Sequence, residues 1–92
     1  MKHNIFFDGK VQSLGFNCMS GYATVGVITP GEYTFNTTRK EHVIIVEGTI
    51  VVTLAHSSPQ SLVKGDSYKV GKNQSFQVSC IDDAAYICYF FD

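Results

Sequence analysis

Apolar and polar positions alternate along almost the whole chain, a pattern typical of strands that bury one face. The segment "EYTFNT" places Tyr33, Phe35 and Thr37 on one side and polar residues on the other. Short apolar runs such as "VIIV", "TIVVTL" and "SFQVSCI" follow it. No stretch of ten or more residues has a convincing helical period. The pattern predicts a series of short strands with at most one short helical turn.

Turn-forming residues separate these runs. Thr29, Pro30, Gly31 and Glu32 suit a type II turn, because proline fixes φ at the second position and glycine accepts a positive φ at the third. Gly48 is expected to form a tight hairpin between two very apolar strands. Short strands at this spacing predict an all-β sandwich or barrel. The length of 92 residues predicts a single domain over residues 1–92.

The composition favours a second copy of this chain as the partner, rather than nucleic acid or a membrane. Apolar residues make up 45% of the chain and charged residues only 16%, against a usual charged share of about 25%. So few charges predict that some surface is hidden in a subunit interface, and a homodimer is expected. The seven basic residues are scattered, which predicts no nucleic-acid partner. No apolar run approaches the roughly 18 residues of a membrane span, so no membrane partner is expected.

The cysteines and the start of the chain predict a cytoplasmic protein. Cys18, Cys80 and Cys88 are odd in number and form no CxxC pair, so neither a disulfide framework nor a zinc site is indicated. Three reduced, partly buried thiols are expected. The opening "MKHNIFFDGK" is too short and too soon charged for a signal peptide.

The spacing of glycines resembles a known family of small β-barrels. Gly31, Glu41 and Gly48 are spaced as in the first motif of the cupins, with Thr37 and Arg39 where that motif has two histidines. Residues 65–76 resemble the second cupin motif, and Phe76 stands where that motif usually has its metal-binding histidine. The resemblance implies a single-domain cupin, a jelly-roll-like β-barrel.

A narrower resemblance extends over almost the whole chain. The segments "FDGKVQSLGF", "ATVGVITPGEYTFNT" and "VIIVEGTIVVTL" resemble the small single-domain cupins known as pyrimidine/purine nucleoside phosphorylases. This resemblance implies phosphorolysis of several purine and pyrimidine nucleosides to a free base and ribose 1-phosphate. Departures from the family pattern lie in the second half, at Gly71-Lys72 and at Tyr89.

Strand alternation predicts a pocket at one end of the barrel. If the strand stays regular, Tyr33, Phe35, Thr37, Arg39 and Glu41 share its inward face. The first two are large and apolar and would form the base of the pocket. The other three would lie towards its mouth. A bulge near position 38 would instead move the last two to the opposite face.

Metal binding is not expected, and phosphate is the predicted co-substrate with no cofactor. A zinc site needs three or four ligands drawn from His, Cys and carboxylates, and the predicted interior offers only Glu41 and Cys80. His42 follows Glu41 directly, so its side chain points the other way along the strand.

Phosphorolysis assigns a hypothetical role to each residue of the pocket. Arg39, the only arginine, would bind phosphate as a fork, with Thr37 donating a hydroxyl. Glu41 would hold the ribose and stabilise positive charge at the anomeric carbon, as carboxylates do in glycoside chemistry. Aromatic rings would stack on a base of any identity. The aromatic candidates are Tyr33, Phe35 and Phe76, with Tyr86 on the last strand as a further substrate-binding candidate.

Two alternatives remain open from the sequence. The aromatic residues are also what a plain core would contain, and residues 39–41 would also suit a solvated turn with a surface ion pair. The protein could therefore be a metal-independent phosphorylase, or a barrel that holds a sugar, nucleotide or other anion without chemistry.

Overall fold

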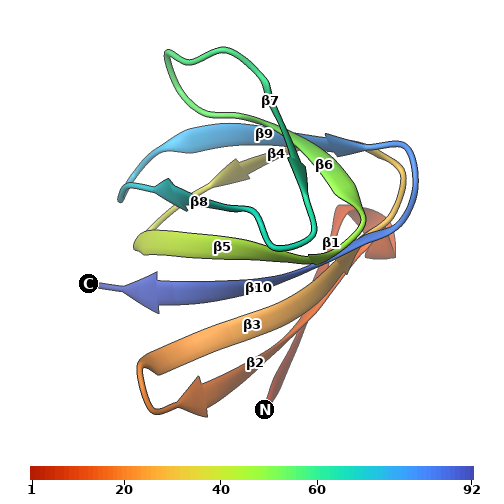
Figure 1. The fold of residues 1–92 in the computed structure, drawn as a ribbon. Helices are drawn as coiled ribbons and strands as arrows, with labels where there is room; N and C mark the ends of the chain where they lie inside the picture. Colours follow the sequence, from red (N-terminus) through yellow and green to blue (C-terminus); the bar gives the residue numbers. More distant parts are fainter.

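The chain forms ten strands and one short helical turn in a computed structural model that describes residues 1–92. The elements are β1 (Lys2–Phe6), the 3₁₀ turn η1 (Phe7–Gly9), β2 (Val11–Cys18), β3 (Gly21–Ile28), β4 (Gly31–Asn36), β5 (Lys40–Glu47), β6 (Thr49–Thr53), β7 (Gln60–Val63), β8 (Ser67–Val70), β9 (Ser75–Cys80) and β10 (Ala84–Phe91). The prediction of an all-β chain with at most one helical turn is confirmed (Figure 1). No helix is long enough to cross a membrane.

The strands form two antiparallel sheets that face one another (Figure 1). The larger sheet has the order β1-β2-β3-β10-β5-β8, and the smaller has the order β4-β9-β6-β7. The chain changes sheet after β3, β4, β5, β7, β8 and β9, so most strand neighbours are distant in sequence. This arrangement is that of a jelly-roll-like barrel or sandwich, with the apolar faces of both sheets turned inward.

The predicted hairpin at Gly48 is wrong. β5 and β6, on either side of it, belong to different sheets, and β6 pairs with β7 and β9. Gly48 has φ +89°, and a Cβ there would lie 2.8 Å from the Asp83 carbonyl oxygen. Glycine is needed because the chain turns a corner between the sheets against the start of β10.

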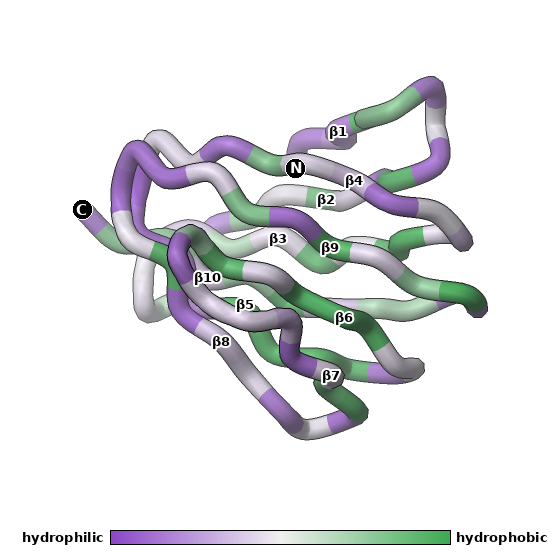
Figure 2. Tube along the Cα trace, turned by 90° about the horizontal axis from the view of Figure 1, so that it is seen from above, coloured by the Kyte–Doolittle hydropathy of each residue, from purple (hydrophilic) through white to green (hydrophobic).

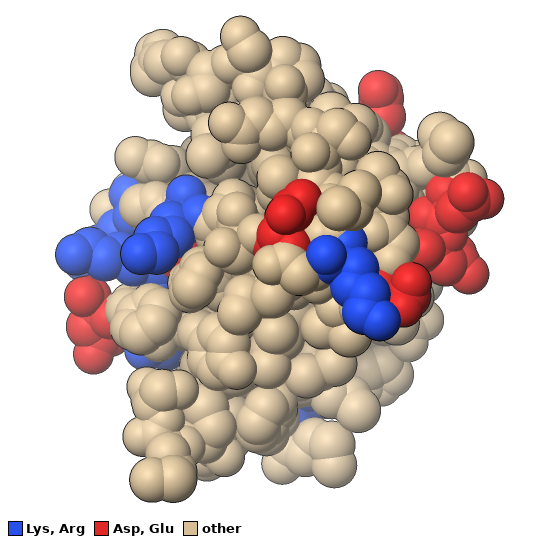
Figure 3. All heavy atoms as spheres, viewed as in Figure 1, with Lys and Arg blue, Asp and Glu red and all other residues tan.

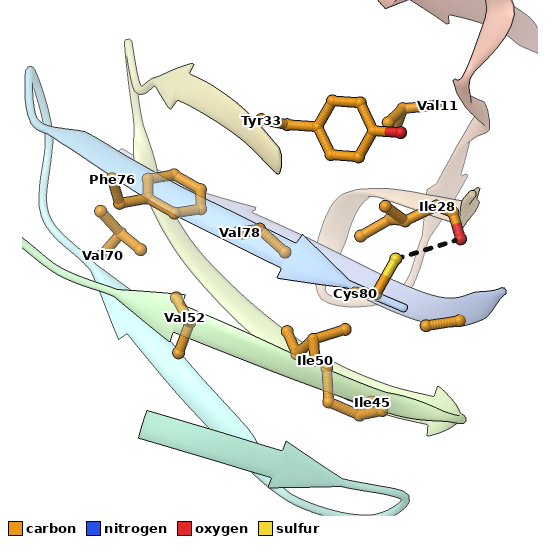
Figure 4. Close-up of a cluster of buried hydrophobic side chains, with 11 residues drawn as sticks. Val11, Ile28, Tyr33, Ile45, Ile50, Val52, Val70, Phe76, Val78 and Cys80 are labelled. Carbon is orange, nitrogen blue, oxygen red and sulfur yellow. Dashed lines mark hydrogen bonds between the residues drawn. The ribbon is translucent and has the colours of Figure 1, made fainter. Parts of the chain in front are cut away.

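The core lies between the two sheets (Figure 4). It consists of alternate residues from both: Val11, Ile28, Tyr33, Ile45, Ile50, Val52, Val70, Phe76, Val78, Cys80 and Ala84. Figure 2 shows a long hydrophobic stretch along β6 and hydrophilic residues in the loops beside the C-terminus. Burial of the alternate positions therefore fixes which face of each strand points towards the interior.

Candidate functional site

A cavity of about 420 Å³ opens between the sheets and is lined mostly by hydrophobic side chains. Its wall on the large sheet follows the inward positions of β10, which are Tyr86, Cys88 and Phe90. The small sheet contributes Phe35 and Phe76. A concave, mostly apolar cavity with a few polar groups is the usual form of a small-molecule site.

Cross-strand pairing determines which residues meet on the inner face of the large sheet. Cys88 pairs with Val43 on one side and Thr24 on the other, and Phe90 pairs with Glu41. Glu41 and Cys88 are therefore diagonal neighbours, close enough for side-chain contact. The Cys88 Sγ–H donates a hydrogen bond to Glu41 Oε1 over 3.5 Å.

Glu41 is the one carboxylate among the residues that line this cavity. Burial raises the pKa of its carboxyl group, and the hydrogen bond from Cys88 opposes that rise. Burial and the nearby carboxylate together raise the pKa of the Cys88 thiol well above its usual value. The thiol therefore stays protonated at neutral pH and remains a hydrogen-bond donor to the carboxylate.

Two tyrosines lie close to this pair. Burial raises the pKa of Tyr86 to about 12, with a hydrogen bond from the Ser13 hydroxyl acting in the opposite direction. Burial is also the main cause of a strongly raised pKa at Tyr68, to which Cys88 and Glu41 add. Both phenols stay neutral at physiological pH, so each can donate a hydrogen bond into the cavity.

The aromatic wall is formed by rings from segments that are distant in sequence. Phe35 and Phe76, which pair across β4 and β9, stack with their ring centroids 5.5 Å apart and their planes 22° apart. The rings of Phe6 and Phe7 meet Phe35 edge-on, with centroids 6.5 and 5.4 Å away. Tyr68 meets Phe76 at 5.8 Å. All of these rings except Phe7 line the cavity, where they can contact a planar ligand.

The structure brings four of the seven predicted site residues to the cavity. Glu41, Phe35, Phe76 and Tyr86 line it. Tyr33 does not line it. The Tyr33 side chain is buried, its ring packs against Phe7, and its hydroxyl donates to the Thr29 carbonyl over 2.8 Å. The roles of the seven residues in substrate binding and catalysis stay predictions.

Thr37 is buried in the connection between β4 and β5, outside the cavity lining. Its hydroxyl donates to the Gly71 carbonyl over 2.6 Å and accepts the Gln74 backbone N–H over 2.9 Å. Its backbone N–H donates to the Gln74 carbonyl over 2.8 Å. These bonds tie the β4–β5 connection to the β8–β9 connection.

Arg39 lies in the same connection and does not line the cavity. The condition of one regular strand through residues 33–41 is not met, because β4 ends at Asn36 and β5 begins at Lys40. The Arg39 guanidinium instead lies over the Phe90 ring, 5.8 Å from its centroid, and pairs with Asp92 at 3.3 Å. Inward alternation resumes at Glu41 and continues at Val43.

Sequence reasoning missed several residues of the cavity. Tyr68 lies in β8, whose alternation could have indicated it. Cys88 was interpreted only as a buried thiol. Lys2 and Asn4 come from β1, which pairs with β2 and brings alternate side chains to the cavity. Their place depends on the order of strands, which no local pattern encodes.

Positive charge gathers beside the cavity. Figure 3 shows Lys and Arg side chains concentrated at the end of the molecule where Figure 1 places the C-terminus. Lys40, His42 and Lys69 line a shallow second pocket there, together with Glu41 and Asp92. No three His, Cys, Asp or Glu side chains are grouped closely enough to hold a metal ion. Absence of a metal from the reaction stays a prediction.

Comparisons with known proteins decide the family. A profile of the family described as pyrimidine/purine nucleoside phosphorylase matches residues 1–90. The chain belongs to this family. A relative of that name from Pseudomonas putida is 39% identical over 92 residues, with 99% of this chain and 98% of the relative covered. Another, from Vibrio cholerae, is 36% identical, with 98% and 96% covered.

Comparison with solved structures supports the fold. A Vibrio parahaemolyticus protein described as of unknown function is 40% identical, with a TM-score of 0.90 over 95% of this chain and 94% of that one. An RmlC-like cupin from Shewanella frigidimarina is 18% identical, with a TM-score of 0.75 over 97% and 81% of the two chains. The second likeness concerns the fold alone, and the expected cupin fold is confirmed.

Proposed function

We propose that this protein is a nucleoside phosphorylase that cleaves purine and pyrimidine nucleosides with inorganic phosphate. The observation that carries the proposal is the lone carboxylate of Glu41 inside an aromatic cavity, in a chain of the nucleoside phosphorylase family. A phosphate oxygen forms a bond to C1′ of the sugar as the bond from C1′ to the base nitrogen breaks. The electrons of that bond leave with the base, which takes up a proton, and (deoxy)ribose 1-phosphate remains.

The ionised Glu41 carboxylate is proposed to face the sugar. Positive charge develops at C1′ and the ring oxygen as the base departs, and a fixed anion stabilises that charge. The nearby apolar and aromatic side chains keep the effective dielectric constant below that of water, which strengthens this interaction. Because the Cys88 hydrogen bond favours the ionised form, it helps to maintain the anion that the reaction needs.

The aromatic wall is proposed to hold the base. Phe35 and Phe76 present ring faces and edges rather than donors and acceptors, so they accept any nucleobase. Tyr86, with its neutral phenol, is proposed to donate a hydrogen bond to the ligand. Tyr33 supports this wall from behind through its contact with Phe7.

Phosphate is proposed to bind beside the cavity, where basic side chains line the second pocket. Arg39 reaches it when the guanidinium leaves the exposed Asp92, a pair that holds it only weakly because both side chains are solvated. Thr37 fixes the connection that carries Arg39, since its hydroxyl is already bonded to Gly71 and Gln74. No cofactor is part of this proposal.

Phosphate dependence separates a phosphorylase from the alternative of a non-catalytic binding barrel. The purified protein is incubated with uridine or inosine, with and without phosphate, and with and without a chelator. Base release only with phosphate, unchanged by the chelator, is the expected result. Release without phosphate would indicate a hydrolase, and binding without release would indicate a non-catalytic barrel.

We further propose that the chain forms a homodimer through the outer face of its large sheet. That face carries a row of apolar cross-strand partners, one each from β2, β3, β10 and β5: Leu14, Val25, Ile87 and Ile44. Leu14 and Val25 are each 45% exposed.

Light scattering should give twice the chain mass, and Val25→Lys should give a monomer. Val63→Lys on β7 is the matched control, and a monomeric wild-type protein would contradict the proposal.

A cytoplasmic location is part of the same proposal. Its support is that Cys18, Cys80 and Cys88 are all free thiols in the fold, as is usual for proteins of a reducing compartment.

A further inference from the structure

Two tyrosine side chains of the cavity wall each lie over a glycine of the adjacent strand. Gly26 in β3 pairs with Tyr86 on one side and with Ser13 on the other. A Cβ on Gly26 would lie 2.6 Å from both Cζ and Oη of Tyr86, and 2.7 Å from Cε1. The ring therefore occupies the space that any other residue at position 26 would fill.

A second tyrosine, Tyr22 in β3, lies over Gly15 in β2, where the two residues are diagonal rather than direct cross-strand neighbours. A Cβ on Gly15 in β2 would overlap the hydroxyl of Tyr22 and would lie 2.7 Å from its Cζ. Tyr22 and Tyr86 both line the cavity. Neither Gly15 nor Gly26 has a positive φ, so neither position needs glycine for its backbone conformation. What both positions need is the absence of a side chain.

We infer that Gly26 and Gly15 are specificity-determining residues that set the depth of the cavity for ligands with two fused rings. This inference rests on the proposed function. With glycine beneath them, the tyrosine side chains pack against the sheet and leave the space on their cavity side to the ligand. With alanine below, the ring of Tyr86 must lift, because the sheet blocks movement in the other direction. The lifted ring occupies the cavity where the outer ring of a purine would lie.

The expected effect is a change in preference rather than a general loss of activity. One added methylene group in a binding pocket changes discrimination by roughly 10–200-fold. Gly26→Ala should therefore lower kcat/KM for inosine about tenfold or more relative to uridine, mainly through KM. Gly26→Ala with Tyr86→Leu restores space above the strand, and should return the inosine-to-uridine ratio towards that of Tyr86→Leu alone.

A matched control uses another glycine without a positive φ. A Cβ on Gly71 would meet only the exposed, flexible side-chain amide of Gln74, 3.1 Å away. Gly71→Ala should leave the inosine-to-uridine ratio unchanged. Gly15→Ala is the independent second variant, and it should shift the ratio in the same direction as Gly26→Ala.

A crystal structure of Gly26→Ala tests the inference apart from catalysis. It should show the Tyr86 ring displaced from the sheet into the cavity. An unmoved ring, or an unchanged inosine-to-uridine ratio in both glycine variants, overturns the inference. Failure of the proposed function looks different, since the wild-type protein would then release no base with phosphate. In that case calorimetry with hypoxanthine and uracil replaces kinetics, and equal losses of binding for both bases overturn the inference.

Discussion

Replacement of Glu41 by glutamine removes one negative charge from the cavity while it keeps the shape of the side chain. A unit charge about 4 Å from the charge that develops on the sugar contributes about 4 kcal/mol at an effective dielectric constant of about 20, and about 1 kcal/mol in bulk water. Glu41 is half-buried, so we expect about 2–3 kcal/mol. This corresponds to a fall of roughly 30- to 150-fold in kcat for Glu41→Gln.

The same substitution should not weaken the fold. Burial raises the folded-state pKa of Glu41 above its unfolded value. The stability that comes from the protonated form is therefore fully present below the unfolded pKa, and is lost as pH rises through the folded pKa. At pH 7 the ionised carboxylate lowers stability, and glutamine removes that cost.

The assay combines turnover with thermal unfolding at two pH values. Initial rates with uridine at saturating phosphate give kcat, and melting curves at pH 5 and pH 8 give stability. Glu41→Gln should unfold at a temperature equal to or above that of the wild-type protein, with the larger gain at pH 8. Near-native turnover would show that this cavity is not the active site. A parallel loss of turnover and melting temperature would show that Glu41 is structural.

Three further substitutions test other parts of the account. Arg39→Ala should raise KM for phosphate with little change in melting temperature, because exposed ion pairs contribute about 0–1 kcal/mol; an unchanged phosphate KM in steady-state kinetics would remove Arg39 from the site. Cys88→Ala should move the acidic limb of the kcat pH profile to higher pH, because the Cys88 hydrogen bond lowers the pKa of Glu41. Cys88→Ser keeps a hydrogen-bond donor and should leave the limb near its original position. The same shift in both variants would argue against the bond. Thr37→Val should cost about 1–3 kcal/mol of stability, since it leaves the part-buried Gly71 carbonyl without its donor. Urea unfolding with an unchanged midpoint would contradict that role.

The sequence predicted the fold class because each strand carries its own alternation. The inward positions of "EYTFNT" and "VIIV" are buried or half-buried as expected, since one face of each strand must leave water. The corner at Gly48 was less predictable. A glycine with positive φ serves a hairpin and a change of sheet equally well, and only packing against Asp83 and Ala84 distinguishes the two.

The candidate site could be predicted only in part, for a physical reason. Glu41 and Phe35 could be placed by alternation within their own strands. Arg39 could not be placed in this way, because β4 ends at Asn36 and β5 begins only at Lys40. The course of the connection between these strands is determined by hydrogen bonds of Thr37. The contact between Cys88 and Glu41 joins residues that are 47 positions apart in the sequence. It depends on cross-strand register, which a single sequence does not show.

The most direct test of the central claim is the stoichiometry of the products. Phosphorus NMR follows the wild-type protein with inosine and phosphate, while chromatography measures the released hypoxanthine. We expect one ribose 1-phosphate formed and one phosphate consumed for each hypoxanthine released, with the rates of both changes falling together in Glu41→Gln. Hypoxanthine released with free ribose and no sugar phosphate, or no hypoxanthine at all, would contradict it.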